Sequence, residues 1–392
     1  MKNTNGGKKV YVGMSGGVDS SVAAALLKEQ GYGVVGVHIK MWGDPEIPCT
    51  FKEDRYDAMR AAAHLGIPFE TWNLTAEYKT AVVEYMIAEY AAGRTPNPDV
   101  MCNREIKFGV FLRRALEQGA DFVSTGHYVR QEPEFPISNF EFRNKKKHDF
   151  KNSSIKNLFK IQNSKLKIAH DLNKDQSYFL WTLTQEQLQH CLFPIGGYTK
   201  PEVRAMAKKI GLPNADKPDS QGICFIGEID MAEFLKKYIP VKSGPVVTTA
   251  GKVVGEHEGL SFYTIGQRHG IEIGGGIPYY VAEKNAKTNT LVVSEGPYDA
   301  KLFSNELEVI GANWISGKEP KLPLKCMARI RYRQPLQKAQ ITKHAARNTK
   351  KETMSRDMFY AVRFEEPQRA VTPGQSVVFY LGDEMLGGGI IA

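Results

Sequence analysis

The chain has 392 residues, of which 42% are hydrophobic and 24% charged, and its formal net charge at pH 7 is +9. This length suits two or three domains, each with its own core. It contains no run of about 18 apolar residues that could cross a bilayer, and its first residues lack the layout of a signal peptide. We therefore expect a soluble cytoplasmic protein without a membrane partner.

The cysteines are scattered rather than paired. No CxxC spacing occurs, and no cysteine has a histidine-rich neighbour at metal-ligand spacing. Neither a zinc site nor a structural disulfide framework is expected from this pattern. The five positions are Cys49, Cys102, Cys191, Cys224 and Cys326.

The positive charge is concentrated in two segments. Residues 143–167 hold nine Lys or Arg against one acid, and residues 321–369 hold thirteen against four, so the rest of the chain is acidic. Clustered Lys and Arg are what phosphate contacts require, which suggests a polyanionic partner. The alternative is that either segment is ordinary solvated surface.

The first part of the chain reads as alternating strands and helices. An apolar strand over 10–14, a helix over 20–31 closed by Gly31 and a strand over 34–42 form a βαβ unit. Such a unit predicts a parallel α/β sheet. The alternation continues with helices at 56–66 and 108–119, an apolar-rich stretch at 78–91 and a strand at 121–129.

The alternation fails between residues 131 and 170. The Lys-, Asn- and Ser-rich stretch at about 135–167 predicts a basic inserted loop or a partly disordered arm. Helical periodicity returns at 176–191 and 200–210. After about residue 240 short β-like runs separated by turns predict one or two small β domains or a barrel.

The stretch GMSGGVDSS (13–21) lies between the first predicted strand and the first predicted helix. A glycine-rich turn there presents free N–H groups and the positive helix end to an anion, so it predicts a phosphate cradle. The stretch lacks the lysine of the Walker loop. It resembles instead the pyrophosphate loop of enzymes that split ATP between the α- and β-phosphates. The alternative is a glycine-rich turn capped by Asp19 or Ser20.

Two further stretches carry candidate binding residues. In STGHYV (124–129), Gly126 could let the backbone approach a nucleotide and His127 could reach a reacting base or its phosphate, although a histidine after a strand is also a common loop residue. In ARIRYRQ (328–334), alternation along a strand would put Arg329, Arg331 and Arg333 on one face, toward phosphate.

The stretch GRTPNPDVMCNREIKF (93–108) offers a reactive thiol. If Asp99 is the N-cap of a helix, Cys102 is its third residue, where free N–H groups lower a thiol's pKa. Asp99 is also available as an acid or base. Cys224 lies in DSQGICFIGE (219–228), a glycine-containing loop that could move a thiol to and from a site. For either cysteine the alternative is an inert buried thiol.

Eight stretches taken together resemble, in order and from end to end, the bacterial tRNA-specific 2-thiouridylase family. They are GMSGGVDSS (13–21), GRTPNPDVMCN (93–103), TGHY (125–128), NKDQSYFL (173–180), DSQGICFIGE (219–228), YTIGQRHG (263–270), RYRQ (331–334) and TPGQSVVFYLGDEMLGGGII (372–391).

The resemblance implies a fold and an activity. The fold would be a parallel-sheet ATP pyrophosphatase domain over 1–230, a small β-rich central domain over 231–297 and a C-terminal β-barrel over 298–392 that contacts tRNA. The enzyme would use ATP, with Mg²⁺, to adenylate the C2 oxygen of the wobble uridine of tRNA, and would then replace that oxygen with sulfur. A cysteine desulfurase or a sulfur relay carrier would supply the sulfur.

The resemblance also implies roles for individual residues. Cys224 would carry a persulfide, Cys102 would be its partner thiol, and Asp99 would be an acid or base beside the target base. The ATP-binding residues would be Gly13, Met14, Ser15, Gly16, Gly17, Val18, Asp19, Ser20, Ile39 and Gly126, with Asp19 a candidate Mg²⁺ contact. The tRNA-binding residues would be Asn97, Pro98, Asp99, His127, Lys174, Asp175, Gln176, Arg331, Tyr332 and Gln375.

The sequence departs from the family pattern at two places. Ile39 stands where methionine is common, and the basic stretch at 143–167 is longer than usual. Three alternatives remain open. An amide-forming ATP pyrophosphatase would not need two reactive cysteines, a 4-thiouridine synthetase would carry its RNA-binding domain before the loop, and a non-catalytic tRNA-binding protein would release no pyrophosphate.

Overall fold

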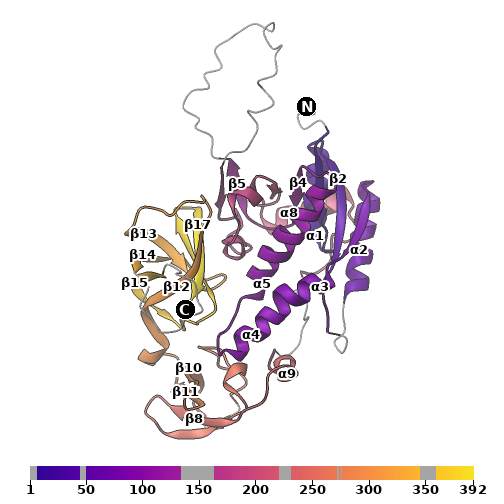
Figure 1. The fold of residues 1–392 in the computed structure, drawn as a ribbon. Coiled ribbons are helices and arrows are strands. Elements are labelled where there is room, and N and C mark those ends of the chain that lie inside the picture. Colours follow the sequence, from indigo (N-terminus) through magenta and orange to yellow (C-terminus); the bar gives the residue numbers. More distant parts are fainter. Residues whose placement is uncertain are drawn as a thin grey trace.

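The computed structural model describes residues 7–44, 50–133, 163–219, 231–271, 273–274, 276–344 and 359–392. Three sheets organise these residues (Figure 1). A parallel sheet lies with its helices on one side of the molecule, a barrel lies beside it, and a small four-stranded sheet lies below the two.

The parallel sheet confirms the predicted α/β class. Its five strands run in the order β3-β2-β1-β4-β7, and every neighbouring pair is parallel. Alternate residues of β1 face opposite sides, because Val10 and Val12 join one core and Tyr11 joins the other. The strands are β1 (Lys9–Gly13), β2 (Gly33–Lys40), β3 (Phe69–Asn73), β4 (Phe122–Ser124) and β7 (Cys191–Leu192).

The helices cover both faces of this sheet. Small buried residues of α1, Ala23 and Ala24, let it pack closely, and Gly31 at φ 86° follows its end. The longer helices are α1 (Val18–Glu29), α2 (Phe51–Leu65), α4 (Tyr85–Ala91), α6 (Phe111–Glu117) and α8 (Lys200–Ile210). The π-helix η2 (Cys102–Val110) has nine residues. The shorter helices are α3 (Thr75–Tyr78), η1 (Lys79–Glu84), α5 (Pro98–Met101), η4 (Ser177–Leu180), α7 (Gln185–Leu188) and α9 (Met231–Lys236).

Two predicted elements of this part are wrong in extent. The strand expected over 121–129 is only β4, since the chain leaves the sheet after Ser124. The helix expected over 176–191 is instead a 3₁₀ turn, η4, and a short helix, α7, because Thr184 caps a new helix start with its side chain.

The second sheet is small and has its own core. Its strands run β10-β11-β8-β9, and Val246, Val281, Leu291 and Val293 fill its buried side. The strands are β8 (Gly244–Thr248), β9 (Val253–His257), β10 (Tyr279–Asn285) and β11 (Thr290–Glu295), with the 3₁₀ turns η5 (Leu260–Phe262) and η6 (Ala300–Leu302) beside them.

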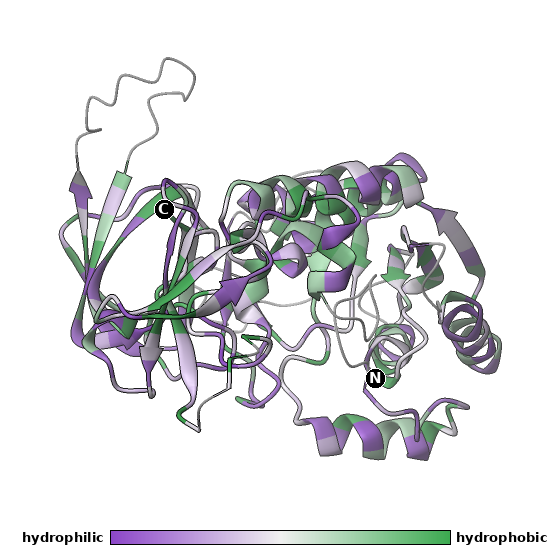
Figure 2. Ribbon diagram, turned by 90° about the horizontal axis from the view of Figure 1, so that it is seen from below, coloured by the Kyte–Doolittle hydropathy of each residue, from purple (hydrophilic) through white to green (hydrophobic). Residues whose placement is uncertain are grey.

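The third sheet closes into a six-stranded barrel, because β12 pairs with both β15 and β17. Hydrophilic and hydrophobic residues alternate along its strands (Figure 2), as expected where one face is buried. The strands are β12 (Phe303–Trp314), β13 (Leu324–Arg329), β14 (Gln337–His344), β15 (Phe359–Arg369), β16 (Ser376–Leu381) and β17 (Glu384–Ile391).

A hairpin from the first half of the chain extends the barrel sheet. It consists of β5 (Arg130–Pro133) and β6 (Ser164–Lys167), and β6 pairs with β17. The prediction of a loop or arm through residue 167 is therefore wrong for its last four residues, because Leu166 is fully buried against the barrel. Residues 134–162 lie outside the described part of the chain.

The predicted arginine face at 329–333 is also wrong. Strand β13 ends at Arg329, and the chain then turns, with Arg333 at φ 62°. The side chain of Arg329 is buried, where it pairs with Asp175 and also donates to Tyr380 Oη at 2.8 Å. This arginine therefore joins the barrel to the parallel-sheet part and does not face solvent.

Candidate functional site

The glycine-rich loop lies where β1 ends and α1 begins, as the sequence predicts. Gly17 is the N-cap of α1, and no side chain caps the helix there. Gly16 has φ 89°, and a Cβ on it would lie 2.3 Å from Asp54 O, so only glycine fits. The uncapped helix end leaves N–H groups and the positive end of the helix dipole for an anion.

A buried amide from a distant part of the sequence holds this loop. The Asn214 side chain donates to Gly16 O at 2.8 Å, Gly17 O at 3.2 Å and Ser21 Oγ at 3.0 Å. In a trans peptide the carbonyl and the next N–H point in opposite directions. Fixing the two carbonyls on Asn214 therefore directs the N–H groups that follow them away from it.

A network of charges lies at the first turn of α1. Asp19 Oδ1 accepts from Tyr128 Oη at 2.8 Å and from Lys200 Nζ at 2.7 Å. Lys200 is only 8% exposed, although it is a lysine, and its ammonium also lies 2.7 Å from Asp219 Oδ1. Lys174 pairs with the other oxygen of Asp219 at 2.5 Å.

Asp219 is ionised by this network. Burial alone would raise its pKa, but the hydrogen bonds and charges of Lys174 and Lys200 outweigh that and lower the pKa to about 2. Lys200 therefore connects Asp19 of the loop to the last described residue before the segment that contains Cys224, itself outside the described residues.

Gly126 lies against the same helix end. A Cβ on it would be 2.7 Å from Ser20 N, so its lack of a side chain permits the close approach of TGHY to α1. Met14 donates its N–H to Val37 O, its carbonyl lies 2.8 Å from His38 Nδ1, and its side chain is buried in the core, so its polar groups are bonded within the chain. Ile39 is half-buried on β2.

His127 is buried rather than exposed to RNA. Its Nδ1 lies 2.7 Å from Thr125 Oγ1, and its ring packs near Phe108 and Phe193. Burial, with a smaller contribution from Lys107, holds the pKa of His127 well below its usual value. The imidazole is therefore neutral and packed within the core.

The helix that contains Cys102 begins two residues earlier than predicted. Asn97 is its N-cap, since its side chain accepts from Val100 N at 3.2 Å, and Pro98 is the first helical residue. The N–H of Cys102 bonds to Asp99 O, and the side chain is 1% exposed. The predicted thiol activation by free N–H groups is thus wrong, because Cys102 lies beyond the first turn. Burial raises the pKa of Asp99, and Lys107 lowers it in part.

Comparison with known proteins identifies the chain's relatives. Three family models match it: a "tRNA methyl transferase HUP domain" over 8–228, a "tRNA methyl transferase PRC-barrel domain" over 232–295 and an "Aminomethyltransferase beta-barrel domain" over 304–391. The "tRNA-specific 2-thiouridylase MnmA" of Geobacillus thermodenitrificans is 46% identical, covering 98% of this chain and 94% of that protein.

The relative of the same name in Enterococcus faecalis is also 46% identical, over 99% of this chain and 96% of that protein. The chain belongs to the tRNA-specific 2-thiouridylase family. A "U34-tRNA thiolase NcsA" from Methanococcus maripaludis has a structure with 17% identity and a TM-score of 0.34, covering 61% of this chain and 69% of that one. That likeness is too weak to argue from.

Most of the residues expected to bind tRNA in this thiouridylase family member also make contacts within the chain. Asp175 is buried between Arg329 and Ser177. Gln176 accepts from Tyr128 N at 2.9 Å, which ties its segment to TGHY. Lys174 is half-buried and pairs with Asp219, so only part of its ammonium is available to RNA.

The expected residues of the C-terminal part join the three sheets. Gln375 donates to Thr95 O at 3.0 Å and to Pro96 O at 2.9 Å. Arg331 donates to Ile265 O at 3.1 Å and to Ala370 O at 3.1 Å. The ring of Tyr332 packs on Phe179 with 4.6 Å between centroids. These side chains hold the segment before α5, the small sheet and the barrel together.

Sequence reasoning missed Lys200 and Asn214. The pattern T-x-x-E at Thr199 and Glu202 predicts a capped helix start, and the structure contains that capping box. Nothing local in the sequence indicates that the first residue of this helix reaches Asp19, because the two positions lie 181 residues apart. Only the packing of α8 against α1 brings them together.

Within the residues that the structure describes, no cluster of three or more His, Cys, Asp or Glu could hold a metal ion. No helix in that part of the chain is long and apolar enough to span a membrane. Asp19 is the residue of the loop that could meet a metal. Its Oδ1 has two donors, while its Oδ2 receives no hydrogen bond from any described residue.

Proposed function

We propose that this chain uses ATP to adenylate the C2 oxygen of the wobble uridine of tRNA and replaces that oxygen with sulfur. The proposal rests on the start of α1, which no side chain caps and which follows a glycine-rich loop held by Asn214. The chain that contains this site belongs to the thiouridylase family. An anion site at that position suits pyrophosphate, which leaves when ATP is split between the α- and β-phosphates.

The chain's own groups define the activation step. The N–H groups of Gly16 and Val18 would bind the departing pyrophosphate. Those of Ser15 and Gly17 already donate to Ser20 Oγ at 3.2 Å and to Ser15 Oγ at 3.3 Å, which shapes the turn. Lys200 neutralises Asp19, so the loop presents less negative charge to the phosphates. Bound Mg²⁺ would neutralise further phosphate charge, and Asp19 Oδ2 is the atom available to it.

Sulfur transfer would follow at the cysteines. The terminal sulfur of a Cys224 persulfide would attack C2, and AMP would leave with the former C2 oxygen. The base would then be held through a sulfur–sulfur bond, and the Cys102 thiolate would attack the Cys224 sulfur, releasing the thiolated base and leaving a Cys102–Cys224 disulfide. An external thiol would reduce that disulfide. A second route, in which Cys102 first frees hydrosulfide, ends in the same disulfide.

The remaining assignments follow the family. Asn97, Pro98 and Asp99 would contact the target base, and Asp99, whose pKa burial raises, could donate or accept a proton there. The domain limits would be 1–230, 231–297 and 298–392. The protein would work in the cytoplasm and receive sulfur from a cysteine desulfurase or a sulfur relay carrier.

The wording of the family models gives a second candidate, methyl transfer to tRNA. The two functions differ in co-substrate and product. Thiolation consumes ATP and exchanges oxygen for sulfur, whereas methylation adds one carbon and needs a methyl donor.

The experiment incubates the protein with tRNA, ATP, Mg²⁺, and a sulfur source, then measures pyrophosphate and the mass of the digested nucleosides. We expect pyrophosphate only when tRNA is present, together with 2-thiouridine. A methylated nucleoside, pyrophosphate release with a small acid instead of tRNA, or tRNA binding without any pyrophosphate would each refute the proposal.

A further inference from the structure

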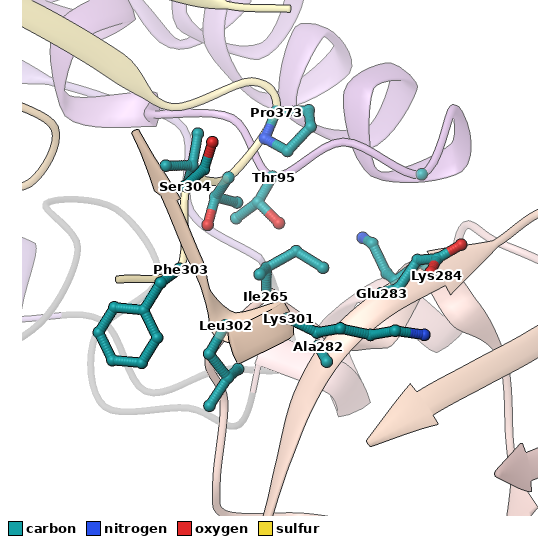
Figure 3. A pocket seen from close by; sticks show the side chains of 13 residues that line it. Thr95, Ile265, Ala282, Glu283, Lys284, Lys301, Leu302, Phe303, Ser304 and Pro373 are labelled. Carbon is teal, nitrogen blue, oxygen red and sulfur yellow. The ribbon is translucent and has the colours of Figure 1, made fainter. Parts of the chain in front are cut away.

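A cavity of about 260 Å³ lies where the three sheets meet (Figure 3). Its walls come from the loop before α5, from the small four-stranded sheet and from the start of the barrel. Its lining includes Thr95, Ile265, Lys284, Ser304, Val371 and Pro373. This volume lies just below the range of about 300–1,000 Å³ typical of drug-sized ligands, so it suits one nucleotide-sized group.

Thr95 fixes the walls of the cavity relative to one another. Its N–H donates to Pro373 O at 2.9 Å, and its hydroxyl lies 3.2 Å from Thr264 Oγ1. Gln375 also donates to Thr95 O. Because one residue bonds to both other parts of the chain, the cavity is a built feature of the junction.

The cavity contains a lysine that is costly to bury. Lys284 Nζ donates to Tyr263 O at 2.9 Å, and burial is the one cause that shifts its pKa, with no carboxylate of the described residues opposing it. Burial lowers the pKa of Lys284 to about 8. An ammonium has three donors, and the carbonyl of Tyr263 uses one. The other donors are available to an acceptor inside the cavity.

The remaining lining suits a flat heterocycle. Ile265 and Pro373 offer apolar surface (Figure 3), and Val371 also lines the cavity. The hydroxyl of Ser304 is bonded to the backbone of Glu306 and takes no part in this. Apolar walls with one strong, directed donor are typical of sites that bind a ring and read one acceptor on it. At the exposed edge, the positive charge of Lys301 is offset by the carboxylate of Glu283, so Lys284 is the donor that distinguishes the cavity.

The place of the cavity argues for RNA. Thr95 lies two residues before Asn97, the start of the segment proposed to hold the target base. Arg331, another proposed tRNA contact, donates to Ile265 O and to Thr372 Oγ1, both in cavity-lining residues. A group in the cavity would therefore be a near neighbour of the reacting uridine. Proteins recognise single-stranded RNA loops by taking up splayed bases one at a time.

We propose that this cavity binds one unstacked base of the anticodon loop next to the target uridine, with Lys284 donating to a ring oxygen or nitrogen of that base. The inference rests on the proposed function, because it takes tRNA as the substrate. It makes the cavity a specificity site that confirms the identity of the neighbouring base before the target is modified.

The RNA arm of the test leaves the protein unchanged. Anticodon stem–loops are compared that carry the target uridine and either an intact loop or an abasic ribose on the 5′ or the 3′ side of the target. We expect kcat/KM for thiolation to fall about tenfold or more for one of the two abasic RNAs. That RNA would lack the base that forms a charge-assisted hydrogen bond and packs in the cavity. Equal kcat/KM for all three RNAs overturns the inference.

The protein arm asks whether Lys284 and the base act together. Lys284→Met is compared with Lys287→Met, which removes the same charge from an exposed position in the turn after the same strand. We expect Lys284→Met to lower kcat/KM for intact RNA about tenfold and to have little further effect on the sensitive abasic RNA. If the losses in kcat/KM from Lys284→Met and from the abasic site simply multiply, the inference is contradicted. The same holds if Lys284→Met has the same kcat/KM as Lys287→Met.

The two levels of failure are distinguishable. If the unchanged protein does not thiolate the intact stem–loop or full tRNA, the proposed function itself fails. If it does so and tolerates both abasic RNAs, only the cavity assignment fails. Affinity for ATP, measured on each variant, shows that Lys284→Met has left the nucleotide loop intact.

Discussion

The nucleotide loop and the three-sheet junction are built in opposite ways. The loop is one continuous stretch, residues 13–20, held by Asn214 and Lys200 from outside it. The junction is assembled from Thr95, Thr264, Lys284 and Pro373, which are distant in the sequence. A short motif therefore suffices for an anion site. The proposed RNA site at the junction requires three parts of the fold to be positioned relative to one another.

Each region also leads to one of the two cysteines. Asp219, tied to the loop through Lys200, precedes the segment with Cys224, and the Thr95–Asn97 segment leads into the helix with Cys102. The two sets of groups should therefore be separable by mutation. Variants on the loop side should affect nucleotide chemistry, and variants on the junction side should affect RNA.

The cysteines give the largest expected effects. Cys224→Ser should accept no transferable sulfur and lose all thiolation, whereas Cys102→Ser should load sulfur but fail to turn over, because no thiolate resolves the sulfur–sulfur bond. Mass mapping after one turnover without reductant should find Cys102 linked to Cys224. Full activity of Cys102→Ser would refute the resolving role.

Loss of the charge pair at the loop comes next. Asp19→Ala should abolish adenylation, and Lys200→Met should lower pyrophosphate release about 10²-fold, because a preorganised charge near the departing phosphates is lost. Binding of tRNA should be nearly unchanged, since RNA affinity is spread over many contacts. Lys209→Met, exposed on the same helix, is the control. Normal pyrophosphate release in Asp19→Ala would show that the loop does not bind pyrophosphate.

A junction variant should give the converse result. Gln375→Ala removes two hydrogen bonds that hold the Thr95–Pro96 backbone, and neutral bonds of this kind are each worth about 1 kcal/mol. We expect a rise of about tenfold in KM for tRNA with unchanged ATP affinity. The control is Gln337→Ala, whose amide bonds to Pro335 O within the barrel. A parallel fall in ATP affinity would mean that the two regions are not separable.

The sequence predicted the loop better than the junction for a physical reason. A phosphate cradle needs only neighbouring residues at a strand–helix turn, so GMSGGVDSS was sufficient to place it. The positions of Arg329 and Arg331 depend instead on where β13 ends, which alternation cannot show. Likewise Cys102 was misplaced by two residues because Asn97 competes with Asp99 as a cap.

The basic insertion should have a smaller effect. Deletion of residues 143–162, which keeps β6 intact, removes seven Lys or Arg and one acid. We expect thiolation to persist, with weaker tRNA binding and a shallower dependence of affinity on salt, because fewer phosphates are neutralised. Binding measured across a salt series tests this, and an unchanged slope would show that the segment does not meet RNA.

The last prediction concerns the stability of the fold, and it separates the junction's binding role from its folding role. Burial lowers the pKa of Lys284 from 10.5 to about 8, so the folded state disfavours the charged amine. Below pH 8 both states are protonated and the full penalty, about 3 kcal/mol, is present.

As pH rises from 8 to 10.5 the folded chain binds fewer protons than the unfolded chain, so the penalty shrinks and the stability of the unchanged protein increases relative to Lys284→Met. Denaturant unfolding of both proteins at pH 7 and pH 10 measures this. We expect Lys284→Met to be at least as stable as the unchanged protein at pH 7, with its advantage falling toward pH 10, and Lys287→Met to show no such trend. If Lys284→Met is less stable at both pH values, this lysine stabilises the fold. A structural role would then account for its burial without a ligand.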